Sequence, residues 1–266
     1  MRVFIIAGEP SGDKLGGALM RGLKKLHPDI AFDGIGGPDM QAQGLKSRFD
    51  MSELSIMGLL EILPRYRALK RRIRETADRV IADEPDVLIS IDSPEFCFRV
   101  AKRVKAKSNV PTVHYVAPTV WAWRPWRASR IAEYVDHLLV LFPFEPACFE
   151  PHGMSCDFVG HPVVAEPVAS ENEAMSFRAA HGIADAPVLL VLPGSRAAEV
   201  KRLKDVFGKA VKSFVDVHTD ARVVVPAAVP VADMVLEAVE SWPVRPVVLD
   251  PRAGGTARAQ QEKRAA

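Results

Sequence analysis

The stretch "RVFIIAGEPSGD", Arg2–Asp13, is the first clear indication of the fold class. A short apolar run is followed by a turn of glycine, proline and serine, and then by an amphipathic stretch over Leu15–Leu26. Similar apolar runs recur along the chain with amphipathic stretches between them, which is typical of parallel strands joined by helical crossovers. We therefore predict a doubly wound α/β fold. The first strands are predicted at Val3–Ala7, Ala31–Ile35, Val87–Ile91, Thr112–Val116, Leu138–Phe142 and Phe158–Val159.

The polar stretch "VAEPVASENEA" interrupts this alternation and predicts a domain boundary near residue 165, between domains 1–165 and 166–266. The second domain has three predicted strands, Val188–Leu192, Arg222–Val225 and Val247–Leu249. Because three strands and a short last helix would leave a sheet edge uncovered, we expect this domain to be incomplete.

Composition excludes several classes of protein. The chain has 266 residues, 48% hydrophobic and 26% charged, and its net charge of +2 is too small to indicate a nucleic-acid partner. The cysteines, Cys97, Cys148 and Cys156, lack paired or metal-ligand spacing, which favours a reducing, cytoplasmic compartment. We find neither a signal-peptide pattern nor an apolar run of roughly 20 residues, so any membrane contact is expected to be peripheral.

The turn "GEPSGD", Gly8–Asp13, lies where a parallel strand would present a ligand. Free N–H groups at the start of the next helix favour an anion or an oxygen-rich ligand, so Ser11, Gly12 and Asp13 are candidate contacts. In the alternative interpretation, Ser11 or Asp13 caps those N–H groups. The GxGxxG spacing of nicotinamide and flavin sites is absent, and no cofactor is expected.

The turn "LPGSR", Leu192–Arg196, repeats this layout in the second domain. Gly194 and Ser195 leave room for a phosphate near the backbone, and Arg196 can neutralise it. The sequence thus predicts a nucleotide-linked donor in a cleft shared by the two domains. The alternative is a capped helix with an exposed arginine.

The stretch "LISIDSPEF", Leu88–Phe96, places Asp92 at the end of a buried strand. A half-buried carboxylate in that position can act as a general base, or it can cap the helix that starts near Pro94. Both interpretations of Asp92 need the same geometry, and the sequence leaves both open.

The stretch "HYVAPTVWAWRPWR", His114–Arg127, brings three tryptophans, Trp121, Trp123 and Trp126, just beyond a predicted strand. Such side chains can line a sugar or acyl pocket, or they can bury the loop against the core. His114, at a strand position, is predicted to be a core histidine rather than a catalyst.

The stretch Ile56–Arg74 joins an apolar patch to six basic residues. It is either a packed helix followed by a solvated one, or an interfacial element that contacts an anionic membrane, and the width of the apolar patch favours the membrane. The predicted membrane contacts are Met57, Leu59, Leu60, Ile62, Leu63, Arg65 and Arg67.

Together these stretches resemble the lipid-A-disaccharide synthase family of bacterial glycosyltransferases. The resemblance is carried by "AGEPSGD" at Ala7–Asp13, "MGLLEIL" at Met57–Leu63, "IDSPEF" at Ile91–Phe96, "HYVAPTVWAWR" at His114–Arg124, "VGHP" at Val159–Pro162 and "LPGSRAAEV" at Leu192–Val200. Their order and spacing agree over essentially the whole chain.

The resemblance implies a metal-independent, inverting GT-B-like enzyme with two Rossmann-type domains, an acceptor and membrane domain followed by a UDP-sugar domain. It would transfer 2,3-diacylglucosamine from UDP-2,3-diacylglucosamine to 2,3-diacylglucosamine 1-phosphate, giving a β-1,6-linked disaccharide 1-phosphate and UDP. Asp92 matches the family's general base and Arg196 the residue that stabilises the leaving UDP. Ile56–Arg74 matches the region expected to meet the inner face of the cytoplasmic membrane.

The sequence also departs from the family pattern. The family's second domain continues into an "SGT" turn and a helix with a glutamate that complete the donor site, whereas this sequence ends at Ala266. We therefore expect weak or no activity from this form. Cys97 stands where many relatives would have asparagine. The alternatives are a non-catalytic lipid-binding remnant and another UDP-sugar enzyme of the same architecture, and the oligomeric state stays open, a homodimer included.

Overall fold

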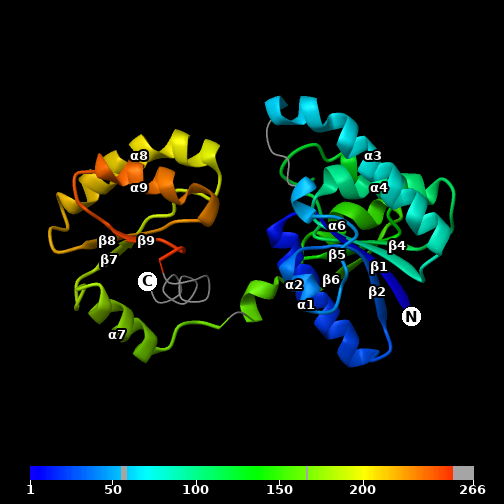
Figure 1. Ribbon diagram of the computed structural model, residues 1–266, viewed down its shortest axis with the longest axis horizontal. Helices are drawn as coiled ribbons and strands as arrows, with labels where there is room; N and C mark the ends of the chain where they lie inside the picture. Colours follow the sequence, from blue (N-terminus) through cyan, green and yellow to red (C-terminus); the bar gives the residue numbers. More distant parts are fainter. Residues whose placement is uncertain (55–58, 166, 254–266) are drawn as a thin grey trace. The chain divides into compact units, whose positions relative to one another are not determined.

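The computed structural model of the chain describes residues 1–54, 59–165 and 167–253, without the side chains of residues 59–65 and 165. The chain divides into two compact units, Met1–Val164 (unit 1) and Ala165–Ala266 (unit 2). Each unit contains its own parallel sheet with helices packed on both faces (Figure 1). The predicted α/β fold class is confirmed.

Unit 1 contains a six-stranded parallel sheet in the order β2-β1-β3-β4-β5-β6. Its strands are β1 (Arg2–Ala7), β2 (Ala31–Ile35), β3 (Val87–Ile91), β4 (Thr112–Tyr115), β5 (His137–Val140) and β6 (Ser155–Phe158). The last predicted strand was misplaced, because β6 covers Ser155–Phe158 and lies at the sheet edge, where mostly exposed residues give no apolar pattern. Val116 was also predicted as a strand residue, but its φ of 80° takes it out of β4.

Alternate residues of β1 pack on opposite faces of the sheet, which explains its unbroken apolar run. Val3 and Ile5 join the core beneath α1, whereas Phe4 and Ile6 join the core beneath α3 and α4. Figure 1 shows α3 and α4 on one side of the sheet and α1 on the other. The helices of unit 1 are α1 (Pro10–Leu26), α2 (Pro38–Gln41), α3 (Leu59–Asp83), α4 (Pro94–Lys105), α5 (Arg127–Ile131) and α6 (Pro146–Phe149), with short 3₁₀ turns at Met51–Glu53, Glu150–His152 and Pro162–Ala165.

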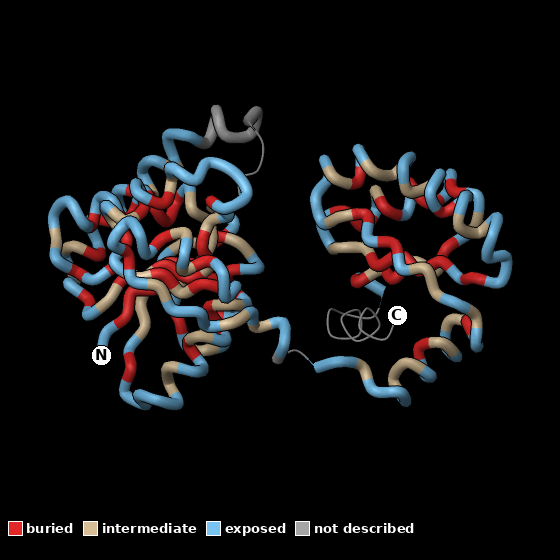
Figure 2. Tube along the Cα trace, turned by 180° about the vertical axis from the view of Figure 1, so that it is seen from behind, coloured by how far each residue is buried: buried red, intermediate tan, exposed pale blue. Residues whose placement is uncertain are grey.

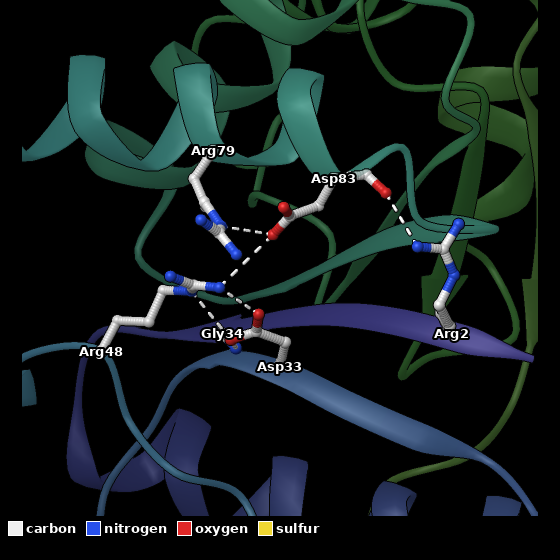
Figure 3. Close-up of polar contacts among 6 residues, drawn as sticks. All are labelled: Arg2, Asp33, Gly34, Arg48, Arg79 and Asp83. Atoms are coloured by element: carbon white, nitrogen blue, oxygen red, sulfur yellow. Dashed lines mark hydrogen bonds and ion pairs between the residues drawn. The ribbon is translucent and has the colours of Figure 1, made fainter.

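A charged network ties the C-terminal end of α3 to the sheet edge (Figure 3). Arg48 donates to both carboxylate oxygens of Asp33 on β2, and its Nη2 lies 3.3 Å from Oδ2 of Asp83. Arg79 pairs with the same Asp83, and Arg2 donates to the Asp83 carbonyl at 3.0 Å. Each exposed pair contributes little alone, but together the contacts give all three arginines of this network, Arg2, Arg48 and Arg79, a partner.

Unit 2 contains three parallel strands in the order β7-β8-β9, at β7 (Val188–Leu190), β8 (Arg222–Pro226) and β9 (Val247–Leu249). Val223 and Val225 face the core shared with α8 (Ala197–Val215) and α9 (Ala232–Glu240), which a short 3₁₀ turn at Val229–Val231 precedes. On the other face Val224 packs with Phe177 of α7 (Glu171–Ala180). Figure 2 shows buried residues running through the strands of each unit. None of the helices in the described ranges combines the length and the apolar composition that a bilayer crossing requires.

Candidate functional site

The carboxyl ends of β1 and β3 form the switch point of the unit 1 sheet. The strand order runs from β1 to β2 on one side and from β3 to β6 on the other, so the connections diverge between β1 and β3. Ligands of open α/β sheets bind in the crevice outside such a point. Gly8 follows β1 directly and Asp92 follows β3 directly, so the fold brings the "GEPSGD" and "IDSPEF" motifs to one place.

The backbone around this point is strained. Asp92 and Ser93 have φ values of 50° and 44°, and Val116, at the end of the neighbouring β4, has a φ of 80°. A β-branched residue in the left-handed region is uncommon, and such residues concentrate at functional sites. The amide of Asp92 donates to the Tyr115 carbonyl at 3.0 Å, which holds the two strand ends together.

The side chain of Asp92 does not cap α4. The N-cap residue is Ser93, and within the described part of the chain the Asp92 carboxylate accepts no hydrogen bond. The capping interpretation is therefore wrong, and a half-buried carboxylate remains available at the strand tip. Behind it, burial and the Asp92 charge raise the pKa of the Cys97 thiol well above its usual range, so Cys97 is a neutral core residue.

Gly8 and Ser93 are in direct contact. A Cβ atom at Gly8 would lie 2.6 Å from Oγ and 3.0 Å from Cβ of Ser93, closer than real Cβ atoms approach other atoms. Oγ of Ser93 is buried and has no hydrogen-bond partner among the described residues. The absence of a side chain at position 8 therefore lets the two motifs meet.

The Asp13 side chain is buried and does not cap α1. The helix α1 begins at Pro10 rather than Leu15, because proline fits the first helical position, so Ser11, Gly12 and Asp13 lie in its first turn. Neither Ser11 nor Asp13 caps α1, whose N-cap is Glu9. The Asp13 carboxylate, 2% exposed, accepts instead from the amides of Gly37, Asp39 and Met40 at 2.7, 2.9 and 3.1 Å.

A cavity of about 620 Å³ opens beside this turn, and Pro10, Gly37, Phe49 and Ser52 are among the residues that line it. Asp13 lies behind one wall and fixes the backbone of Gly37. Ser11 is exposed at the same helix start. This cavity could not be predicted from local sequence patterns, because Pro10, Gly37 and Phe49 come from three separate segments of the chain.

The three tryptophans stay exposed. Trp121, Trp123 and Trp126 are 48%, 55% and 53% exposed, so the interpretation that they bury the loop against the core is wrong. The Trp121 ring meets Phe144 edge-on at 5.3 Å, and Phe144 stacks on Phe142 at 5.7 Å. The aromatic cluster that the two phenylalanines form with Trp121 was not predicted, although "FPF" begins at the last residue of the predicted strand Leu138–Phe142.

His114 is a core residue, as predicted. It is fully buried, its Nδ1 lies 2.8 Å from Oγ of Ser90, and its ring packs against Phe98 at 4.6 Å. Burial lowers the pKa of His114 to about 3, so the ring is neutral.

In unit 2 the "LPGSR" turn is capped by the chain's own carboxylate. Oε2 of Glu199 accepts from the amides of Ser195 and Arg196 at 3.0 and 3.3 Å. Gly194, with a φ of 110°, allows this contact, because a Cβ there would lie 2.6 Å from the same oxygen. The Arg196 side chain is 53% exposed and reaches Glu199 at only 3.4 Å. The backbone thus fits the capped-helix alternative, while the guanidinium remains available.

The predicted membrane contacts fall mostly outside the described residues. Met57 lies in the gap at 55–58, and the side chains of Leu59, Leu60, Ile62, Leu63 and Arg65 are not described. Arg67 is exposed on α3.

The unit folds have solved counterparts. The chain is similar to UDP-GlcNAc 2-epimerase from Neisseria meningitidis bound to UDP-GlcNAc, with a TM-score of 0.65 and 13% identity over 98% of this chain and 75% of that one. It is also similar to S. aureus MnaA in a UDP co-structure, with a TM-score of 0.61 and 13% identity over 93% and 67% of the two chains. The lipopolysaccharide outer core galactosyltransferase WaaB matches with a TM-score of 0.50. At these identities the likeness shows the fold, that of GT-B glycosyltransferases and related epimerases.

Sequence relatives are more specific. The chain is 59% identical over its 266 residues to the lipid-A-disaccharide synthase of Ruegeria pomeroyi, of which it spans 66%. It is 50% identical over 250 residues to that of Rhodospirillum centenum, covering 93% of this chain and 62% of the relative. The chain thus spans about two thirds of the length of these relatives. A family model described as lipid-A-disaccharide synthetase matches residues 3–242, and the chain therefore belongs to this family.

Proposed function

We propose that this chain carries the acceptor-activating site and part of the donor site of a lipid-A-disaccharide synthase. The reaction is the transfer of 2,3-diacylglucosamine from UDP-2,3-diacylglucosamine to 2,3-diacylglucosamine 1-phosphate. Beyond family membership, one observation supports it most: a carboxylate without hydrogen-bond partners in the described chain, Asp92, at a strained switch point.

In the proposed mechanism Asp92 is the general base. It takes the proton of the acceptor 6-hydroxyl as that oxygen attacks the anomeric carbon of the donor, and the bond from this carbon to UDP breaks with inversion. The carboxylate suits this task because no internal donor competes for it within the described chain. The contact between Gly8 and Ser93 sets the position of Asp92.

Arg196 is proposed to compensate the charge of the departing UDP, in place of a metal ion. Its guanidinium is half exposed and held only by a 3.4 Å contact to Glu199, so reorienting it toward a diphosphate costs little. Gly194 and Ser195 are proposed to approach the donor as well. Because Glu199 already accepts from the amide of Ser195, the serine hydroxyl is the better candidate for that contact.

The acceptor is proposed to bind near the first turn of α1. Ser11 is exposed there, and Gly12 adds no side chain to the helix start. Asp13 holds the backbone of Gly37, which lines the cavity of about 620 Å³. Trp121 and Trp123 follow the carboxyl end of β4 in the same sheet. Their exposed rings can contact a sugar or an acyl chain. We propose further that Ile56–Arg74 holds the protein peripherally on the inner face of the cytoplasmic membrane.

The test is an assay of disaccharide and UDP formation with both diacylated substrates. Because the chain spans two thirds of its relatives, the assay uses it alone and joined to the remaining segment of the Ruegeria pomeroyi relative. We expect turnover from the joined chain and much slower turnover from the 266-residue chain.

Asp92→Asn in the joined chain should lower turnover by about 10²- to 10⁴-fold while changing UDP-sugar binding by less than about two-fold. The matched control is Asp29→Asn, at an exposed position away from the switch point. Unchanged turnover in Asp92→Asn would exclude the general-base role. Vesicle binding without any turnover would favour a non-catalytic lipid-binding protein, and turnover with non-acylated substrates only would favour a different UDP-sugar enzyme.

A further inference from the structure

A groove of about 710 Å³ lies between α3 and α4, away from the switch point. Six of its eight lining residues are cationic, namely Lys70, Arg74, Arg99, Lys102, Arg103 and Lys107, and none is acidic. The other two, Ile73 and Ala106, give it an apolar floor. Of its six cations, only Lys70 and Arg74 belong to the stretch Ile56–Arg74 that was predicted to contact the membrane.

Helical spacing explains why these charges meet. Lys70 and Arg74 are four residues apart on α3, and Arg99, Lys102 and Arg103 follow the i, i+3, i+4 pattern on α4, so each set shares one helix face. The two helices lie side by side over the same core (Figure 1). Both cationic faces therefore line one hollow, where mutual repulsion makes the empty groove electrostatically unfavourable.

Several other cations of these helices form ion pairs with acidic side chains of the protein. Arg72 pairs with Glu53 at 2.8 Å, Arg79 pairs with Asp83 (Figure 3), and Lys105 pairs with Asp136 at 2.5 Å. In contrast, Arg74, Lys102, Arg103 and Lys107 have no acidic partner in the described ranges.

The remaining two lining cations are only lightly engaged. Arg99 contacts Glu95 at 3.0 Å on the helix surface, and Lys70 lies over the ring of Tyr66 at 4.7 Å. The acidic side chains of the described protein thus neutralise little of the positive charge of the groove, so an external anion can bind there.

A neighbouring hollow of about 430 Å³ shares Arg99 and Lys102 and is also lined by Arg127 and Arg130, but it contains two carboxylates, Glu95 and Glu133. Its mixed charge makes it a poorer anion site. The groove between α3 and α4, which has no carboxylate in its lining, is therefore the better candidate site for an anionic ligand.

We infer that this groove binds the phosphate groups of anionic membrane lipids, as an electrostatic contact of unit 1 with the bilayer surface. A lipid headgroup fits because its phosphate meets the cationic rim while its glycerol carbons meet Ile73 and Ala106. Arg67, one of the predicted membrane contacts, lies three residues before Lys70 on the same face of α3. The inference rests on the proposed peripheral membrane location and adds α4 as a second contact helix.

The test is flotation of the 266-residue chain with phosphatidylcholine vesicles that contain or lack 30% phosphatidylglycerol. The variant Arg74→Gln/Lys102→Gln removes one unpaired cation from each helix. The control Arg79→Gln/Lys105→Gln also removes an arginine from α3 and a lysine from α4, but both are ion-paired. Circular dichroism checks that both variants fold.

We expect the groove variant to bind anionic vesicles about 20- to 30-fold more weakly, because each basic residue at such a surface contributes about five-fold. The control should stay within about two-fold, and raising the salt concentration should weaken wild-type binding. Equal binding of the two variants would overturn the inference, as would binding that ignores phosphatidylglycerol. The assay contains no sugar nucleotide, so its outcome is independent of the transferase test on Asp92.

Discussion

The turns after β1 and after β7 have similar sequences but use their acidic side chains in different ways. In unit 1, Asp13 is buried and accepts from three amides that lie 24 to 27 residues away. In unit 2, Glu199 accepts from two amides three and four residues away, and its side chain is 33% exposed. The first turn is thus a joint between distant segments, while the second is a locally capped helix that leaves Arg196 outside.

The largest expected effect tests this contrast directly. Asp13→Ala leaves three amides without their acceptor, two of them fully buried, and should lower the free energy of unfolding of unit 1 by about 4 kcal/mol. Glu199→Ala should cost only about 1 kcal/mol, because water can replace an exposed cap. Urea unfolding, monitored by amide hydrogen exchange in each unit, measures the unfolding free energies of both variants. Similar losses in the two variants would show that the turns are equivalent.

Acid should separate the two units as well. The pKa of His114 in unit 1 is about 3, below the value of about 6.5 of an unfolded histidine, so the unfolded chain binds one more proton between these values. The stability that the neutral ring contributes is fully present above pH 6.5 and is lost as the pH falls toward 3. At pH 5 the loss amounts to about 2 kcal/mol. His114→Gln should flatten this slope in unit 1. An unchanged slope would mean that other groups cause the acid sensitivity.

The glycines of the two turns offer a finer comparison. Gly8→Ala should cost about 1.5 kcal/mol and displace Asp92, because the new Cβ would meet Ser93, and Ser93→Gly should restore much of the loss. Gly194→Ala should not be rescued by Glu199→Ala, since its φ of 110° is unfavourable for alanine whatever the neighbour. Double-mutant cycles on unfolding free energies give both couplings. Rescue at Gly194, or none at Gly8, would reverse this account.

The fold class could be predicted from the sequence because β1, β3 and their neighbours are buried on both faces and therefore form apolar runs. Sequence patterns misplaced β6, whose edge position removes that signal. Asp92 could be located because a strand end is a local feature. The partners of Asp13 could not, because they depend on which loop folds against α1. The groove was missed for a similar reason, since the cations of α4 look like an ordinary solvated face until α3 lies beside them.

The smallest effect on stability is expected for Arg196, and that makes it the sharpest probe of the second turn. Its guanidinium is 53% exposed and 3.4 Å from Glu199, so Arg196→Ala should change the unfolding free energy by less than about 1 kcal/mol. A loss of UDP binding, measured by calorimetry on the chain joined to its relative's remaining segment, would then report a ligand contact rather than a folding defect. Lys201→Ala, an exposed cation one turn further along α8, is the matched control. If both variants bind UDP like the wild type, the second turn is only a capped helix. The turns after β1 and after β7 would then differ only in how deeply their acidic side chains are buried.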